Sequence, residues 1–246
     1  MCCFSREVRM VADTNIFARA SKGGRQFLVY SMRVDAPKEL AMILPIPVPA
    51  KSAEDAVKFI SLKEYDAFFT DLKKCFPEPP PPSPSRDSKR PAPKAAALPV
   101  VEVGAFAASF VPSIGDFERL DERFRLRSEV WKSLPQYSDY GFAVFQLKEG
   151  EQKVHPMAFE FPRRKADKLF FPTVHIHDGQ VRLKARFDHA LYCQVDEGTS
   201  TVEWDESPGH ARQSVKVEKA QGLIEPDAHV YRRRLVGMLE NADTWA

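Results

Sequence analysis

Three histidines in the C-terminal half carry side chains that could bind a metal ion or move a proton. His175 and His177 alternate within residues 171–178, and His189 follows beside Asp188. Alternate residues of a strand share one face, so a His-x-His pair is a common arrangement of metal ligands. An imidazole in a pocket could instead act as a general acid or base near neutral pH.

The dipeptide Asp178-Gly179 makes it possible to test this arrangement by counting. It favours a two-residue hairpin turn, which pairs His177 with Gln180 and His175 with Arg182. The histidine face then also carries Arg182 and Lys184, whose positive charges repel a divalent cation. The core face carries the apolar residues, which are Val174, Ile176, Val181, Leu183, Ala185 and Phe187.

The same register separates the third histidine from the other two. His189 lies seven residues beyond Arg182, the expected partner of His175. At about 3.3 Å per residue this is roughly 23 Å along an extended strand. We therefore predict no metal site, and we expect a polar surface that faces solvent or a partner, formed by His175, His177, Arg182 and Lys184. His189 interrupts a series of apolar odd-numbered residues, so it is either a hydrogen-bonded core histidine or a pocket histidine able to transfer a proton.

The N-terminal cysteines offer a second kind of chemistry. Removal of Met1 would leave Cys2 with a free α-amine, which can act as the base for its own thiol. The segment Ile16-Phe17-Ala18-Arg19 resembles bile-salt-hydrolase-like N-terminal-nucleophile hydrolases, in which an arginine supports the nucleophile. The resemblance ends at Ala20-Ser21-Lys22, where that class carries Asn-x-Asp. A further alternative is soft-metal binding by Cys2 and Cys3.

The composition excludes several classes of partner. The chain has 246 residues, of which 28% are charged, and a net charge of +2, so it has no long-range field that would gather nucleic acid. No apolar run is long enough to cross a bilayer, and the first residues do not resemble a secretory signal. Four cysteines in no disulfide spacing, at positions 2, 3, 75 and 193, favour reduced thiols and a cytoplasmic location.

The order of the elements predicts an α+β protein with antiparallel sheets and helices grouped on the outside. We expect an N-terminal sheet with helices over 1–76, a disordered proline-rich linker over 77–99, and a C-terminal α+β half over 100–246 that shares a core with 1–76. Helices are expected behind the capping patterns at Ser61, Ser113 and Ser207, and a short one over 128–134. Residues 229–239 suit either a strand or an amphipathic helix.

One resemblance covers more of the chain. Residues 27–34, the segment Ala41-Met42-Ile43-Leu44-Pro45-Ile46-Pro47 and the aromatic helix that ends at Phe76 resemble an uncharacterised bacterial family. Gly141-Phe142-Ala143-Val144-Phe145 and His155-Pro156-Met157 resemble a later strand pair of the same family. Its members carry a tryptophan near the position of Met42 and a secretion signal, which this chain lacks. The resemblance implies a fold unit and no reaction.

Together these observations favour a non-catalytic binding or assembly protein of the bacterial cytoplasm. We expect a protein partner or self-association, no nucleic acid, no membrane and no cofactor. The alternative is a cysteine amidohydrolase that uses Cys2 with Arg19 in support, and the second alternative is soft-metal binding through Cys2 and Cys3. Phosphate-binding loops of the GxGxxG and GxxxxGK[ST] types are absent from the sequence.

Overall fold

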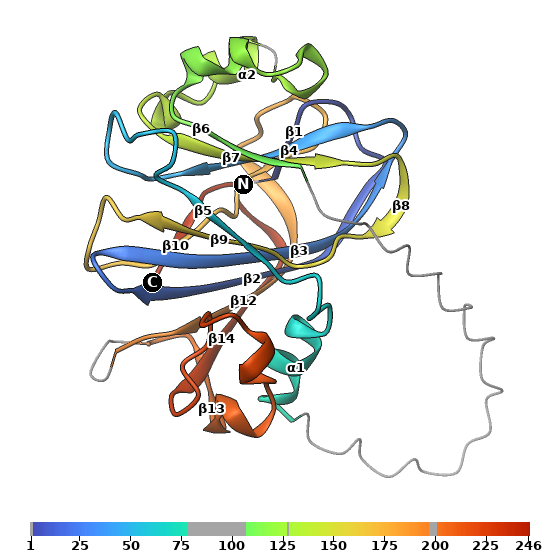
Figure 1. Ribbon diagram of the computed structural model, residues 1–246. Helices are drawn as coiled ribbons and strands as arrows, with labels where there is room; N and C mark the ends of the chain where they lie inside the picture. Colours follow the sequence, from blue (N-terminus) through green and yellow to red (C-terminus); the bar gives the residue numbers. More distant parts are fainter. Residues whose placement is uncertain (1, 78–106, 127, 197–200) are drawn as a thin grey trace, which may run out of the picture.

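The computed structural model describes residues 2–77, 107–126, 128–196 and 201–246, and in this part of the chain the fold is dominated by strands (Figure 1). The α-helices are short: α1 spans Phe68–Lys74 and α2 spans Ser128–Lys132. Short 3₁₀ helices occur in some of the connections. The strands are β1 (Cys2–Phe4), β2 (Met10–Ser21), β3 (Arg25–Ala36), β4 (Leu40–Ile46), β5 (Lys58–Ser61), β6 (Ala108–Val111), β7 (Gly141–Leu147), β8 (Gly150–Lys153), β9 (Met157–Pro162), β10 (Phe170–Phe171), β11 (His175–Ile176), β12 (Lys184–Gln194), β13 (Asp205–His210), β14 (His229–Glu240) and β15 (Thr244–Trp245).

The strands form two large sheets and one small one. The first sheet has the order β11-β1-β4-β7-β6, and the second has the order β13-β14-β12-β2-β3-β9-β5, with β8 pairing beside β9 on β3. Strands β10 and β15 form a separate pair. Most neighbours are antiparallel, whereas β1 with β11 and β12 with β2 are parallel.

The two large sheets lie face to face, and each also carries a cover on its outer side (Figure 1). One core fills the space between them, where β4 and β7 meet β2, β3 and β9. A second core lies between the outer face of the first sheet and α2 with its neighbouring 3₁₀ turns. A third packs α1 and the 211–224 loops on the outer face of the second sheet. The period-2 alternation of strand residues sends successive side chains into different cores.

The predicted fold class is confirmed only in its coarser part, because the protein is built of sheets with a few outer helices. The α+β description overstates the helical content. Behind Ser113 the chain forms the 3₁₀ helix Ile114–Arg119, and behind Ser207 it forms β13 and 3₁₀ turns. Ser113 Oγ donates to the Asp116 carboxylate at 2.7 Å and so does not cap a backbone N–H.

Other local predictions fared differently. The helix over 128–134 is confirmed as α2, and the ambiguous segment 229–239 is the strand β14. The aromatic helix is confirmed as α1, although Ser61 belongs to β5 and does not cap it. Pro45 lies within β4, which continues to Ile46. Strand β7 pairs with Pro45, but β1 pairs with β4 only at Met42 and Ile43, so no described strand pairs with Pro45 on the β1 side, where a proline is tolerated.

Both sheets combine strands from the two sides of residues 78–106. In the first sheet β4 pairs with β7, and in the second β3 pairs with β9. The predicted linker over 77–99 lies outside the described residues except for Pro77. Among the helices of the described part, none has the length and apolar character needed to span a bilayer.

A buried glutamine on β3 forms two hydrogen bonds with the backbone of β10. Gln26 on β3 is fully buried, and its Nε2 donates to the carbonyl of Phe170 at 2.7 Å while its Oε1 accepts from the Phe170 N–H at 3.0 Å. Gln26→Leu would leave both backbone groups of Phe170 without these partners. We expect this variant to lower the free energy of unfolding in urea by about 2–4 kcal/mol.

Gln180→Leu is the matched control, because Gln180 is exposed. This control should stay within about 0.5 kcal/mol of the wild type. Equal unfolding free energies for the two variants would contradict the role given to Gln26.

Candidate functional site

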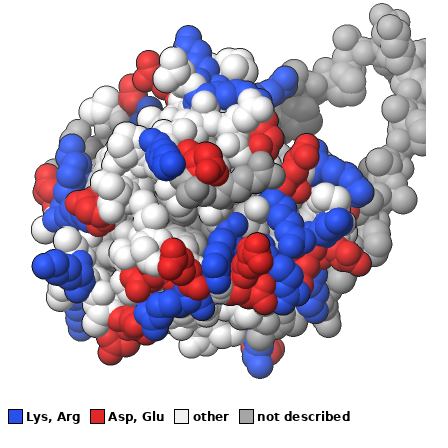
Figure 2. All heavy atoms as spheres, turned by 90° about the horizontal axis from the view of Figure 1, so that it is seen from above, with Lys and Arg blue, Asp and Glu red and all other residues white. Residues whose placement is uncertain are grey.

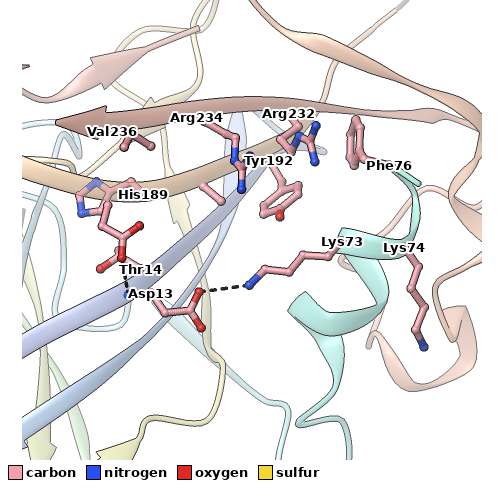
Figure 3. A pocket seen from close by; sticks show the side chains of 12 residues that line it. Asp13, Thr14, Lys73, Lys74, Phe76, His189, Tyr192, Arg232, Arg234 and Val236 are labelled. Atoms are coloured by element: carbon pink, nitrogen blue, oxygen red, sulfur yellow. Dashed lines mark hydrogen bonds and ion pairs between the residues drawn. The ribbon is translucent and has the colours of Figure 1, made fainter. Parts of the chain in front are cut away.

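A pocket opens on the outer face of the second sheet, where α1 lies against β2, β12 and β14 (Figure 3). Its volume is about 520 Å³. The polar residues at its wall come from four elements that are distant in the sequence. They include Asp13 of β2, Lys73 of α1, Tyr192 of β12, and Arg232 and Arg234 of β14.

Most of the charges around the pocket are already paired. Lys73 Nζ lies 3.1 Å from Asp13 Oδ1, as the dashed line in Figure 3 shows. Arg232 lies 3.1 Å from Asp205 and stacks over the ring of Phe76 at 4.4 Å. Arg234 is the exception, since no ion pair or hydrogen bond of its guanidinium occurs within the described residues. This guanidinium gives the pocket an unsatisfied positive charge.

The protonation states of the pocket groups favour binding over catalysis. Burial raises the pKa of the Tyr192 hydroxyl to about 12, and the positive charges of Arg232 and Arg234 offset only part of that effect. Burial also lowers the pKa of His189 well below 6.5. Tyr192 is therefore protonated and His189 neutral at pH 7. The pocket holds no hydrogen-bonded pair of a nucleophile and a base among the residues that the structure describes.

The three histidines come together on the other side of β12. The rings of His175 and His189 stack with their centroids 4.6 Å apart and an interplanar angle of 15°. His175 Nδ1 lies 3.2 Å from His177 Nε2, within hydrogen-bond reach. The ring of Phe187 contacts His175 and His189 edge-on, and that of Phe4 contacts His177. We call His175, His177 and His189 the histidine cluster.

Burial keeps the histidine cluster uncharged. It lowers the pKa of His175 to about 3 and that of His177 to about 4, and neighbouring imidazoles lower the pKa of His175 and His189 further. Both ring nitrogens of His189 and Nε2 of His175 are buried without a hydrogen-bond partner in the described structure. The hydrogen-bonded core histidine that the sequence suggested at position 189 is therefore buried as expected, but it is not hydrogen-bonded.

The histidine cluster does not have the geometry of a metal centre. Three imidazoles that bind zinc direct one nitrogen each at a common point about 2.0–2.1 Å away. The rings of His175 and His189 instead lie nearly parallel, one over the other. Within the described residues, no group of three or more histidine, cysteine or acidic side chains could hold a metal ion.

The predicted hairpin register is wrong, and this error explains the misplaced histidines. Strand β11 does not pair with the residues after Gly179; it pairs in parallel with β1, with Cys2 opposite His175. Asn241 also accepts from the His175 N–H at 2.7 Å and donates to its carbonyl at 3.0 Å. The chain therefore loops between His177 and Lys184 and re-enters as β12 in the other sheet, which brings His189 beside His175.

The basic residues that were predicted to share the histidine face lie apart from it. Arg182 is exposed and forms a two-pronged ion pair with Asp178 inside the loop, at 3.1 and 2.7 Å. Lys184 is also exposed and lies opposite Glu240 at the start of β12. Val181 and Leu183, which were assigned to the core, are 39% and 92% exposed.

Arg19 occupies a place unlike the one predicted for it. Its guanidinium donates to the carbonyls of Leu223 at 2.8 Å and Gly222 at 2.6 Å, and it lies 4.0 Å from Glu225. All its polar contacts in the described part go to this 222–225 turn, while Cys2 belongs to the other sheet. Arg19 therefore anchors the turn, and its support of Cys2 stays a prediction.

The second member of the proposed soft-metal pair is buried. Cys3 has no exposed surface and packs in the core beneath α2 with Ile43 and Phe142. Binding of one metal ion by both thiols remains a prediction.

The sequence contained a signal for the pocket that was not used. The run Arg232-Arg233-Arg234 suits a strand or a helix by sequence alone, and only the strand that the structure shows places Arg232 and Arg234 on the same face. Asp13 and Lys73 could not be connected with them, because nothing in the sequence indicates that α1 lies over β2 and β14.

An exposed apolar surface lies at one end of β12 and β14, where Val236 and Met238 share the face of the pocket and Leu239 lies on the opposite face of β14. Most of the large apolar side chains that are exposed in the described structure lie there, and we call this surface the apolar end. Its members are Val181 (39% exposed), Leu183 (92%), Val236 (65%), Met238 (64%) and Leu239 (36%).

Comparison with known proteins identifies a fold but not a family. No family model matches the sequence, and no curated protein matches it either. The crystal structure of baculovirus P35 has a TM-score of 0.52 and 14% sequence identity, and the match covers 99% of this chain and 98% of that one. This likeness shows a shared fold over nearly the whole length of both chains.

Two further solved structures of the same viral protein are also similar. A mutated P35 after caspase cleavage has a TM-score of 0.48 at 15% identity and covers 95% of this chain and 99% of that one. P35 in its complex with caspase-8 has a TM-score of 0.46 at 13% identity, with 95% of each chain covered.

The lowered pKa values make the stability of the fold depend on pH. Because the folded-state pKa values lie below the ordinary 6.5, the unfolded chain binds more protons between about pH 6.5 and pH 4. The free energy of unfolding should therefore fall as the pH is lowered through this window. Each histidine contributes at most about 1.4 kcal/mol per pH unit.

His189→Leu tests this dependence, because it removes one titrating group and two unpartnered buried nitrogens. We expect urea unfolding to show unchanged or higher stability at pH 7.5 and a smaller loss between pH 7.5 and pH 5. His210→Gln, which replaces an exposed histidine, should keep the slope of the wild type. A wild-type slope in His189→Leu would contradict the buried neutral state.

Proposed function

We propose that this chain is a non-catalytic binding and assembly protein that acts by holding other protein chains. The apolar end is the observation that carries the proposal. Soluble domains rarely expose neighbouring large apolar side chains without a partner for them, and such patches mark protein–protein contacts. Val236 and Met238, two residues apart on one face of β14, are each about two-thirds exposed.

The charge distribution supports a protein partner over a polyanion. Figure 2 shows basic and acidic side chains interspersed on the face viewed there, without a broad field of one sign. Three of the four basic residues around the pocket are also neutralised by acidic neighbours, namely Lys73, Lys74 and Arg232. Nucleic acid binding would need many unpaired cations along one surface.

The fold suggests which class of protein to test first. P35, whose fold this chain shares, has been solved in a complex with caspase-8. We therefore propose a cysteine protease of the caspase class as the candidate target. The proposal needs no catalytic residue in this chain, and it agrees with the absence of a nucleophile–base pair around the described pocket.

One observation favours the alternative of a cysteine amidohydrolase. The parallel pairing of β1 with β11 sets the backbone of Cys2 opposite that of His175. A histidine that accepts the thiol proton is one route to an activated thiolate, and this route would require the pKa of His175 to rise above the value of about 3 that its burial gives it. Arg19 has no part in this version, since its guanidinium is engaged by the 222–225 turn.

The target class can be tested with active caspase-8 and a short fluorogenic peptide. We expect increasing amounts of the purified chain to reduce peptide cleavage in proportion, with loss of activity near a one-to-one ratio. Trypsin, a serine protease, is the specificity control and should keep its rate. The intact mass of the chain after incubation shows whether it has also been cut. Undiminished caspase-8 activity at tenfold excess of the chain would exclude this target.

Alkylation of Cys2 separates the two functions. For a binding protein we expect its reaction with iodoacetamide to slow on the order of 100-fold from pH 8.5 to pH 6, as for an ordinary thiol. An activated nucleophile would instead keep reacting at pH 6, and His175→Phe would slow it. Peptide mapping by mass spectrometry locates the adduct, and an intact mass that retains Met1 would eliminate the amidohydrolase.

A further inference from the structure

One edge of the second sheet is open along most of a long strand. Strand β14 pairs with β12 from Tyr231 to Glu240. Its other edge is covered by β13 only at His229, Tyr231 and Arg232. From Arg233 onward, no described strand lies on that side. An open edge of this kind presents unpaired N–H and C=O groups that can accept another strand.

The sequence of this open edge is self-complementary. From Arg234 it reads Arg-Leu-Val-Gly-Met-Leu-Glu, with a base at one end, an acid at the other, apolar pairs inside and Gly237 at the centre. We propose that β14 pairs antiparallel with β14 of a second copy of this chain about a two-fold axis at Gly237. The proposal rests on the assembly function argued above, and it names the partner of the apolar end.

Hydrogen-bond geometry limits the registers that such a pair can adopt. In an antiparallel pair, two opposing residues either both direct their N–H and C=O groups toward each other or both direct them away from each other. Along one strand these two orientations alternate from residue to residue. Residues that oppose each other across the axis must therefore both be even-numbered or both odd-numbered. With Gly237 opposite itself, Val236 opposes Met238 and Leu235 opposes Leu239. Arg234 then opposes Glu240.

This register satisfies the groups that the single chain leaves exposed. Val236 and Met238 are 65% and 64% exposed, and each would cover the other. Arg234 and Glu240 have no side-chain ion pair within the described residues. In the dimer, Arg234 of each copy would pair with Glu240 of the other copy, which gives two ion pairs. All four side chains lie on the same face of β14, because they are separated by even numbers.

The neighbouring registers lose these matches. A shift that sets Val236 opposite itself places Arg234 against Met238 and Glu240 against Arg232, which already pairs with Asp205. A shift to Met238 places Val236 against Glu240. Because side-chain matching fixes the register of a strand pair, the glycine-centred register is favoured over both.

Gly237 is suited to the position on the axis. Its φ is +94°, and a Cβ added there would meet nothing within 4 Å. No described atom therefore crowds the face of β14 to which a side chain at this position would point. A glycine within a strand commonly marks a close approach of another backbone.

Charge reversal tests the proposed pairing directly. Sedimentation velocity from 1 to 100 µM should show a dimer for the wild type. Arg234→Glu and Glu240→Arg should each weaken dimerisation about tenfold or more, because each replaces two opposite-charge pairs by two like-charge pairs. The double variant Arg234→Glu/Glu240→Arg restores both pairs and should dimerise within about threefold of the wild type.

The controls exclude general effects of charge and folding. Lys58→Glu makes the same charge change on β5, at the far edge of the same sheet, and should leave the dimer intact. Met238→Lys should give a monomer with the wild-type melting temperature. A wild type that remains monomeric at 100 µM, or a double variant that stays dissociated, would overturn the pairing. Caspase-8 inhibition is measured separately, so failure of that target can be distinguished from failure of this interface.

Discussion

Every residue of β4 is buried, and the rest of the structure depends on this double burial of one strand. Met42 and Leu44 enter the core between the two sheets, whereas Ala41 and Ile43 enter the core beneath α2. Each large apolar side chain removed from water in this way contributes about 1.5–3 kcal/mol. A strand that is covered on both faces needs apolar residues at every position, and β4 has them from Leu40 to Ile46.

The histidine cluster follows from the way the N-terminus joins this arrangement. Strand β1 lies between β4 and β11, so it fixes β11 at the edge of the first sheet. The 177–184 loop then carries the chain into the second sheet, where β12 passes close to β11 and the rings of His175 and His189 stack. Buried imidazole nitrogens without partners cost about 1–3 kcal/mol each. These unpartnered nitrogens lie where the two sheets adjoin. Burial destabilises a neutral imidazole less than a protonated one, so the histidines there are neutral.

The sequence predicted local structure well and relative placement poorly. The N-terminal sheet expected within residues 1–76 and the aromatic helix that ends near Phe76 are present as β2 to β4 and α1, because such patterns depend on neighbouring residues. The Asp178-Gly179 turn failed for the opposite reason. Gly179 does adopt a positive φ of 74°, as a turn requires, but the strand bonds of His175 go to β1 and to Asn241. Those partners are far away in the sequence, so counting along the chain could not reveal them.

The same reasoning explains why the pocket residues were missed and the histidines misjudged. Arg232 and Asp13 line the same pocket because β2 and β14 both flank β12, one parallel and one antiparallel. No periodicity encodes that order of strands. In contrast, the burial of His189 was readable from its place in an apolar series, since that pattern depends only on which face of β12 points inward.

The two edges of the second sheet are treated differently, and this contrast supports a contact at β14. Strand β5 closes one edge with only four residues, among them the exposed Lys58 and the 38% exposed Phe59, and very short edge strands resist pairing with other chains. Strand β14 is three times as long, and its uncovered part carries Val236 and Met238 where a protected edge would carry lysine or proline. The uncovered part of β14 is therefore more compatible with a partner strand than the short β5 edge is. The central Gly237 and the opposite charges at the two ends then favour one particular partner, the same strand of a second copy.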